Sequence, residues 1–144
     1  MLSGQIVTGL GLMLITIILH AIFMVGAARL LKWRQSRFGS VEREMERAIL
    51  VSVLVAWLFS AIVLEALVWA LFYLVNPWIT ALPDLETAFY FSMVTFTTLG
   101  YGDVVLTGPW RTLASIQAAN GVIIFGWTTA LIFYFIQHLY GQAD

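Results

Sequence analysis

A short segment near the middle of the chain, residues 97–103, has the sequence Thr-Thr-Leu-Gly-Tyr-Gly-Asp. Its two glycines flank a tyrosine, and glycine allows the backbone to turn so that successive carbonyl oxygens point the same way. Four such strands, one from each of four chains, form rings of carbonyl oxygens that replace the hydration shell of a cation. The hydroxyl oxygen of Thr98 extends the row at its inner end. The segment therefore predicts a site that binds a cation after its water has been removed.

Residues 98–102, Thr-Leu-Gly-Tyr-Gly, resemble the signature filter of potassium channels, usually Thr-Val-Gly-Tyr-Gly, and Asp103 follows in the expected position. The resemblance covers the pore module, roughly Val51 to Gln137, and looks most like small prokaryotic channels with one pore loop per chain. The departure is Leu99, which stands where valine is commonest. Its side chain is expected to point away from the ion path, so the leucine changes packing behind the filter and selectivity should survive.

The resemblance implies a potassium-selective channel, a homotetramer that conducts passively as ions displace one another between adjacent sites. Potassium would be bound by Thr98, Leu99, Gly100 and Tyr101. The filter would be supported by Tyr90, Val94, Thr97, Gly102 and Asp103. Potassium is the permeant ion, no cofactor is expected, and no catalytic constellation suggests an enzyme.

Two of these supporting positions concern the back of the filter. In related channels an aromatic residue on the preceding helix often holds the aspartate after the filter, and by position Tyr90 is expected to hold Asp103. Many relatives also carry a glutamate four residues before the filter threonine, where this chain has Val94. A carboxyl–carboxylate pair cannot form there, which puts the slow filter inactivation associated with that pair in doubt.

The composition is that of a membrane protein. The chain has 144 residues, of which 61% are hydrophobic and 10% charged, and its mean hydropathy is +0.92. Stretches of about 20 apolar residues are membrane spans by default, and three appear, at about residues 6–31, 48–75 and 113–139. Cysteine is absent, which excludes disulfides and thiolate metal sites.

The charge distribution predicts the orientation. Six of the seven basic residues lie between the first and second spans: Arg29, Lys32, Arg34, Arg37, Arg43 and Arg47. Because cytoplasmic loops carry an excess of Lys and Arg, this connection is expected inside the cell and the N-terminus outside. The loop Asn76–Pro109, with the filter, is then outside, and the C-terminus is cytoplasmic. We expect a multi-pass protein of the plasma membrane.

The segment before the filter predicts a short helix. Pro83, Asp84 and Glu86 suit a first helical turn, and about 13 residues are too few to span the bilayer. We therefore predict an all-α membrane protein with three transmembrane helices, a re-entrant pore helix and a filter, in a four-fold tetramer. Its parts are an N-terminal transmembrane helix (1–31), a basic cytoplasmic linker with an interfacial helix (32–47) and a pore domain (48–144).

The basic linker permits several interpretations. The segment Ser36–Arg47 is polar, and at its end Glu42, Arg43, Glu46 and Arg47 can alternate opposite charges along one helical face. This predicts a short interfacial helix that is either a solvated connector or a gating lever. Arg29, Lys32 and Arg34 break the every-third spacing of a voltage sensor, so a cytoplasmic anchor is favoured over voltage sensing. Residues 29–47 are also expected to contact anionic lipid.

The third span predicts a cavity and gate. With Phe125 toward the pore axis, helical spacing places these residues on one stripe: Val122, Phe125, Thr129, Phe133 and Ile136. Thr129 would face water in the cavity, and Phe133 with Ile136 would form a constriction that gates by dewetting. Gly121 resembles the inner-helix hinge of potassium channels, although close helix packing is the favoured interpretation.

Glu65 is the one acid inside a predicted span, and such a carboxylate needs a partner. The candidates are Gln117 and Asn120 on the third span, and Ser92 and Thr95 on the pore helix. We favour a hydrogen bond that braces the pore helix over proton sensing. If Glu65 senses protons, Glu65→Gln should abolish any pH dependence of open probability.

Three alternatives to a potassium-selective channel stay open. Some relatives with Gly-Tyr-Gly also pass sodium, so the pore could be a weakly selective cation channel. The chain could instead be a pore subunit that needs a partner protein. A remote alternative is a haem-binding membrane anchor, in which His20 and His138 ligate the iron as a pair.

Overall fold

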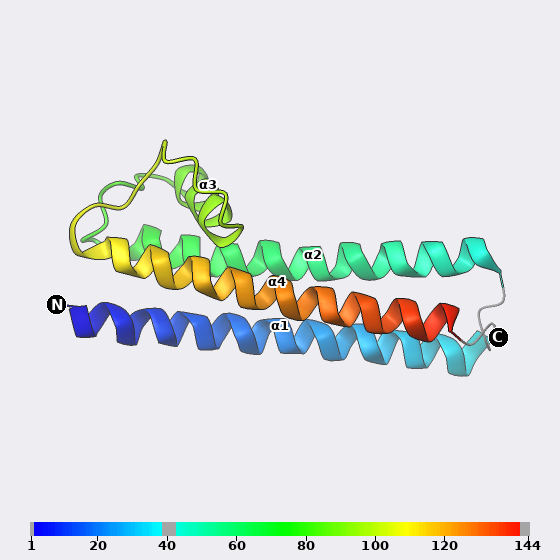
Figure 1. Cartoon of the computed structure of the whole chain (residues 1–144). Coiled ribbons are helices and arrows are strands. Elements are labelled where there is room, and N and C mark those ends of the chain that lie inside the picture. The colour runs from blue at the N-terminus through cyan, green and yellow to red at the C-terminus, as the bar shows by residue number, and fades with distance from the viewer. Residues whose placement is uncertain (1, 39–42, 142–144) are drawn as a thin grey trace.

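Three long helices run side by side in the computed structural model, which describes residues 2–38 and 43–141. They are α1 (Leu2–Phe38), α2 (Glu44–Val75) and α4 (Arg111–Tyr140) (Figure 1). Each is long and apolar enough to cross a membrane. Across the described ranges the chain forms no strand. The predicted all-α fold with three spans is therefore confirmed.

A short fourth helix, α3 (Leu85–Phe96), packs against one end of this bundle (Figure 1). It begins at Asp84, whose carboxylate accepts a hydrogen bond from the backbone N–H of Thr87 at 2.8 Å. This bond lowers the pKa of the Asp84 carboxyl below its usual value. The 12 residues of α3 rise about 18 Å, which is less than the thickness of the hydrocarbon core. The helix is too short to be a span.

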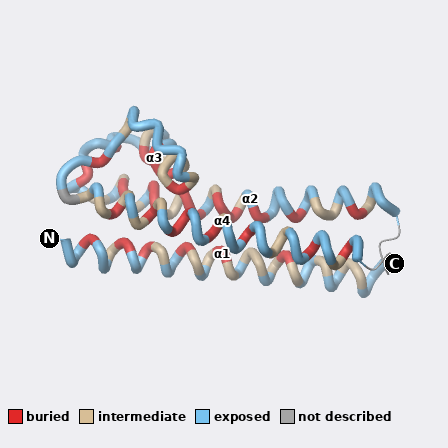
Figure 2. The backbone as a smooth tube through the Cα atoms, in the orientation of Figure 1, coloured by how far each residue is buried: buried red, intermediate tan, exposed pale blue. Residues whose placement is uncertain are grey.

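Buried residues, red in Figure 2, occur along all three long helices, and the larger cluster of buried hydrophobic side chains joins α3 to α2 and α4. Trp69 and Tyr73 of α2, Phe96 of α3, and Leu113 and Ile124 of α4 have no exposed surface. A one-turn 3-10 helix, η1 (Gly108–Trp110), leads from the loop after α3 into α4. The hydrophobic core therefore holds the short helix and the segment that follows it in a fixed position.

The connection between α1 and α2 differs from the prediction. Helix α1 continues to Phe38, and Glu44–Arg47 form the first turn of α2, so the described part of the linker has no separate interfacial helix. Residues 39–42 of that linker lie outside the described ranges. Helices α1 and α2 extend beyond the predicted spans because hydropathy marks only the apolar part of a helix, whereas Glu, Arg and Lys continue it readily.

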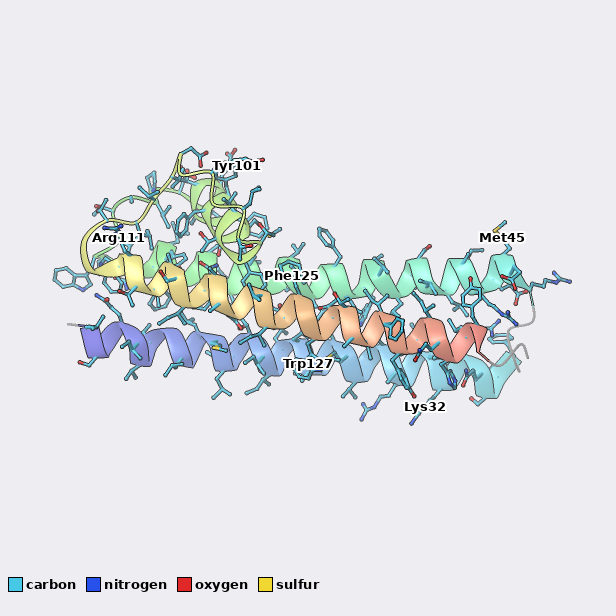
Figure 3. The ribbon with its side chains drawn as sticks, viewed as in Figure 1. Lys32, Met45, Tyr101, Arg111, Phe125 and Trp127 are labelled. Atoms are coloured by element: carbon cyan, nitrogen blue, oxygen red, sulfur yellow. The ribbon has the colours of Figure 1, made fainter. Side chains whose placement is uncertain are left out.

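The two ends of the bundle differ in chemistry. The filter end holds Tyr101, whereas Lys32 and Met45 lie at the opposite end, called here the basic end (Figure 3). At the basic end an ion pair between Arg34 Nη2 and Glu46 Oε2, 3.2 Å long, joins α1 to α2. The basic linker and the filter segment therefore occupy opposite ends of the three long helices.

Candidate functional site

The backbone after α3 alternates in handedness along the filter segment. Thr98, Gly100 and Gly102 have φ values of 60°, 51° and 81°, whereas Leu99 and Tyr101 between them do not have positive φ. Alternation of left-handed and right-handed residues turns successive peptide groups the same way, so their N–H groups lie on one side and their carbonyl oxygens on the other. This is the geometry that a row of carbonyl ligands requires.

The end of α3 fixes the N–H side of this segment. The carbonyl of Val94 accepts hydrogen bonds from the N–H groups of Leu99 and Gly100, at 3.0 and 3.2 Å. Thr97 closes the helix, since its N–H and its hydroxyl both donate to the carbonyl of Met93. Because these N–H groups are bound to the helix end, the carbonyls of the segment are left for other ligands.

The far end of the segment is held by one strong hydrogen bond. Tyr90 Oη donates to Asp103 Oδ2 at 2.6 Å, which lowers the pKa of the Asp103 carboxyl below its usual value. The bond expected between these two side chains is present, and its role in supporting the filter stays a prediction. Val94 contributes only its backbone carbonyl to the segment, since its side chain has no carboxyl group. Asp103 is therefore held by the hydroxyl of Tyr90 and has no carboxyl partner at position 94.

Replacement of Tyr90 with phenylalanine should make the filter sensitive to milder acid. The Asp103 carboxylate of the wild type has a lowered pKa, so it keeps its negative charge above that pKa and is neutralised only as the pH falls through it; the loss of this charge is expected to weaken the attraction for cations. Without the hydroxyl, the pKa of Asp103 returns toward its usual value of about 4. Currents recorded while the outer pH is lowered should therefore fall at a higher pH in Tyr90→Phe than in the wild type.

The matched control is Tyr134→Phe, which removes the hydroxyl of an exposed tyrosine on α4. It should leave the acid response unchanged. Identical acid responses in Tyr90→Phe and the wild type would show that the Tyr90–Asp103 bond does not support the filter.

A buried polar cluster ties α3 to both neighbouring helices. Gln117 of α4 donates from Nε2 to Ser92 Oγ at 2.6 Å and accepts from Tyr73 Oη of α2 at 2.8 Å. None of these three residues has exposed surface. Tyr73 was not foreseen, and Ser92 and Gln117, considered as partners of Glu65, bind each other instead. The cluster therefore holds α3 against α2 and α4 by hydrogen bonds.

Gly121 allows α4 to touch the end of α3. A Cβ atom at this glycine would lie 1.8 Å from the carbonyl oxygen of Phe96, the last residue of α3. Only a residue without a side chain fits such an approach. This contact supports the packing interpretation of Gly121, and bending at this residue stays a prediction.

Gly121→Ala is expected to lower the stability of the protein. The new methyl group must push α4 away from the Phe96 carbonyl, and overpacking of this kind costs about 1–3 kcal/mol. Gly126→Ala is the matched control, because its Cβ would meet nothing within 4 Å, and alanine favours the helix by about 1 kcal/mol. Thermal unfolding in detergent should show a lower Tm for Gly121→Ala only. An unchanged Tm with altered gating would favour a hinge instead.

The five residues predicted to line a cavity all lie on the side of α4 that is exposed or partly exposed in the single chain: Val122, Phe125, Thr129, Phe133 and Ile136. The opposite side of α4 is buried against the other helices. The ring of Phe125 packs 6.2 Å from that of Phe96, so this stripe begins directly beside the end of α3 (Figure 3). Its role as cavity and gate stays a prediction.

Glu65 has its partner on α1, outside the residues expected from the sequence. Its Oε1 lies 2.9 Å from Nδ1 of His20 on α1, and neither side chain has exposed surface. The other ring nitrogen of His20 lies 3.1 Å from Thr128 Oγ1 on α4. The hydroxyl of Thr128 also donates to the carbonyl of Ile124 at 2.8 Å. His20 therefore joins Glu65 of α2 to Thr128 of α4 through its two ring nitrogens.

A second buried hydrogen bond between α1 and α4 lies one turn of α1 away from His20. Asn120 Nδ2 of α4 donates to Thr16 Oγ1 of α1 at 2.6 Å, again with both side chains fully buried. Thr16 and His20 are four residues apart and so share one face of α1. The predicted partners of Glu65 were therefore wrong, because α1 was treated as separate from the pore module. A threonine and a histidine at this spacing in an apolar helix were the available signal.

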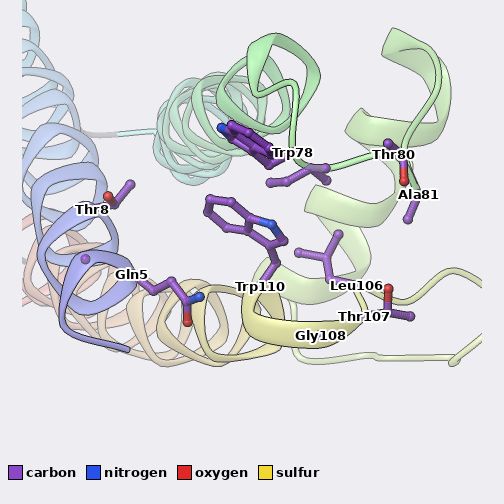
Figure 4. Close-up of a pocket in the computed structure, with 11 residues that line it drawn as sticks. Gln5, Thr8, Trp78, Thr80, Ala81, Leu106, Thr107, Gly108 and Trp110 are labelled. Carbon is purple, nitrogen blue, oxygen red and sulfur yellow. The ribbon is translucent and has the colours of Figure 1, made fainter. Parts of the chain in front are cut away.

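A cavity of about 700 Å³ lies at the filter end, between the start of α1 and the loops on either side of α3. Trp78 and Trp110 lie across from each other in it, and Gln5 and Thr8 of α1 form another wall (Figure 4). Its described lining residues include no charged side chain and no residue of the filter segment. The cavity is therefore separate from the row of filter carbonyls.

The comparison with known families agrees with this geometry. Residues 52–138, more than half of the chain, match the model of a family described as ion channel. Comparison with curated proteins and with solved structures gives no match. The matched residues begin in α2, include α3 and the filter segment, and end in α4, as the resemblance to a potassium channel pore domain predicted. The chain is a membrane protein that belongs to the ion channel family.

Proposed function

We propose that this protein is a potassium-selective channel that conducts passively through the carbonyl groups of residues 98–101. The observation that carries the proposal is the alternation of φ along the segment, together with the N–H groups bound at the end of α3. Rings of carbonyls in this arrangement replace the water of potassium. Asp84, Glu86 and Asp103, on the same loop and helix start, would raise the local concentration of cations.

A homotetramer is part of the proposal. In the single chain the filter segment is exposed, with 69% of Tyr101 and 55% of Leu99 accessible, and irregular backbone at membrane depth needs to be buried in protein or to line water. Three further copies would provide this environment. The exposed stripe on α4 would then face the same axis as the filter.

The proposed location is the plasma membrane, with the filter end outside and the basic end in the cytoplasm. The cluster of Lys and Arg at the basic end supports this orientation. Because the filter lies at the other end of the bundle (Figure 3), the same orientation places the filter at the outer surface.

The haem-anchor alternative has less support. Both ring nitrogens of His20 already have partners, Glu65 and Thr128, and a nitrogen so engaged cannot ligate iron. His138 Nε2 lies 3.2 Å from Gln35 Nε2 instead of facing His20.

Reconstitution of the purified protein into liposomes with a potassium gradient tests the proposal. The current should reverse near the equilibrium potential of potassium. Reversal between the potassium and sodium potentials would indicate the weakly selective channel. Current that appears only when a second protein is added would indicate a pore subunit that needs a partner.

A further inference from the structure

A narrow apolar groove lies at the basic end, where α1, α2 and α4 meet. Its volume is about 130 Å³. Its floor is made of buried residues from all three helices, among them Ala27, Leu54 and Phe135, and its rim includes the exposed Leu30 and Val53. A groove of this composition on a membrane protein accepts a hydrocarbon chain.

One charged side chain lines this groove, and part of its hydrogen-bonding capacity is unused. Arg34 Nη2 binds Glu46 at 3.2 Å, whereas Arg34 Nη1 is buried and has no hydrogen-bond partner. A guanidinium group has five N–H donors, and a buried donor without a partner is costly. No acidic residue is among the described residues that line the groove, so the described lining offers this guanidinium no carboxylate.

The groove is closed at its other end. Trp57 Nε1 of α2 donates to the carbonyl of Phe23 on α1 at 3.0 Å, and its ring packs against Gly26, where a Cβ would lie 3.3 Å away. From Ala27 to Arg34 the groove extends about 10 Å along α1, at 1.5 Å per residue. It is therefore an apolar slot with an indole at its inner end and a partly unpaired guanidinium at its mouth.

The surroundings add positive charge to this mouth. Arg29, Lys32 and Arg37 belong to the last turns of α1, and none of them forms an ion pair with a residue in the described ranges. Clusters of Lys and Arg at the end of a membrane helix attract anionic lipid headgroups. Arginine is well suited to phosphate, which accepts from two of its N–H groups at once.

We propose that this groove binds one anionic phospholipid per chain, with an acyl chain in the slot and the phosphate on the partly exposed guanidinium of Arg34. The protein is surrounded by lipid because it belongs to a family of membrane channels. The choice of the cytoplasmic leaflet rests on the orientation proposed above. A lipid in this position contacts α1 and α2 together, so it links the first helix to the pore domain where the ion pair Arg34–Glu46 also joins them.

Native mass spectrometry of the intact protein tests the site, with phosphatidylglycerol and phosphatidylcholine as probes at equal concentration. The wild type should retain one phosphatidylglycerol per chain in preference to phosphatidylcholine. Arg34→Gln should weaken phosphatidylglycerol binding about tenfold or more, since a hydrogen bond to a charged group is lost. Arg111→Gln, an equal charge change at an exposed site at the other end of the bundle (Figure 3), should weaken it less than about twofold.

Two further variants separate the site from its alternatives. Glu46→Gln removes the ion pair but keeps Arg34, and it should retain the lipid, whereas equal losses in Glu46→Gln and Arg34→Gln would mean that only the helix contact matters. Val53→Trp fills the rim without a change of charge, so it should reduce binding even if Arg34→Gln does not fold. Inorganic phosphate should not displace the lipid.

Four results would overturn the proposal. They are equal retention of the two lipids by the wild type, displacement of phosphatidylglycerol by inorganic phosphate, equal losses in Glu46→Gln and Arg34→Gln, and unchanged binding in both Arg34→Gln and Val53→Trp. Potassium flux is measured separately on the same preparations. A wild type that conducts but has no lipid preference refutes this site alone, and a wild type that binds lipid but does not conduct refutes the proposed function alone.

Discussion

Replacement of Gly100 with alanine is expected to abolish the potassium current of the reconstituted protein. Gly100 has a φ of 51°, a conformation that costs an L-residue with a side chain about 1–2 kcal/mol. Alanine would relax toward negative φ and turn its carbonyl away from the row. Since ions bind in a series of adjacent sites, the loss of one ring interrupts the whole path. Single-channel and macroscopic currents in liposomes measure the effect.

Gly11→Ala is the control for this experiment. Gly11 lies in α1, and a Cβ there would meet nothing within 4 Å, so its current should be that of the wild type. Both variants should show the same helix content and the same oligomeric state. A persistent current in Gly100→Ala would mean that ions pass elsewhere than through residues 98–101.

Removal of the Glu65 side chain should give the largest loss of stability among single substitutions on the face between α1 and the pore domain. Glu65→Ala leaves Nδ1 of His20 without its partner in a site with no exposed surface. Breaking a buried pair by removing one member costs about 3–5 kcal/mol. Glu65→Gln preserves a hydrogen bond and should cost only about 1 kcal/mol. Thermal unfolding in detergent should rank the proteins wild type, Glu65→Gln, Glu65→Ala.

A double-mutant cycle with His20→Ala tests whether the two residues act together. If they do, the loss in the double variant should be clearly smaller than the sum of the two single losses. Simple additivity, or a stable Glu65→Ala, would contradict the pairing. Proton sensing is examined on the same set: a pH dependence of open probability that disappears in Glu65→Gln would assign that role to Glu65.

The parts of the fold that depend on residues close together in the sequence could be predicted. The three spans follow from hydropathy, and α3 follows from an N-cap aspartate and a short apolar stretch. Asp84 accepts from Thr87 as an N-cap, while Pro83, expected in the first turn, precedes the cap. The filter motif is itself local, since its glycines supply the positive φ values. Thr98, with a φ of 60°, is the one such position that composition did not suggest.

The contacts between distant segments could not be predicted in the same way. His20 and Glu65 are 45 residues apart, and Thr16 and Asn120 are 104 apart. Several polar side chains in the spans were equally plausible partners, because hydropathy fixes the depth of a residue in the membrane but not the neighbour of each helix. The position of α1 against α4 decided which pairs form.

The first helix lies outside the family match, because the matched residues begin at 52, yet it is hydrogen-bonded to both long helices of the matched region. Helix α1 is bound to α4 at Asn120 and Thr128 and to α2 at Glu65. These bonds lie on the face of α4 opposite the predicted cavity stripe. If the proposed channel gates by a movement of α4, then α1 must move with it or these hydrogen bonds must break.

The central claim is that the carbonyls of residues 98–101 select potassium, and the reversal potential tests it most directly. Liposomes containing the purified protein are given a tenfold potassium gradient, with sodium replacing potassium on the dilute side. A potassium-selective channel predicts reversal near the potassium potential, about 59 mV from zero for a tenfold gradient. Reversal near zero, where potassium and sodium pass equally, would contradict the account.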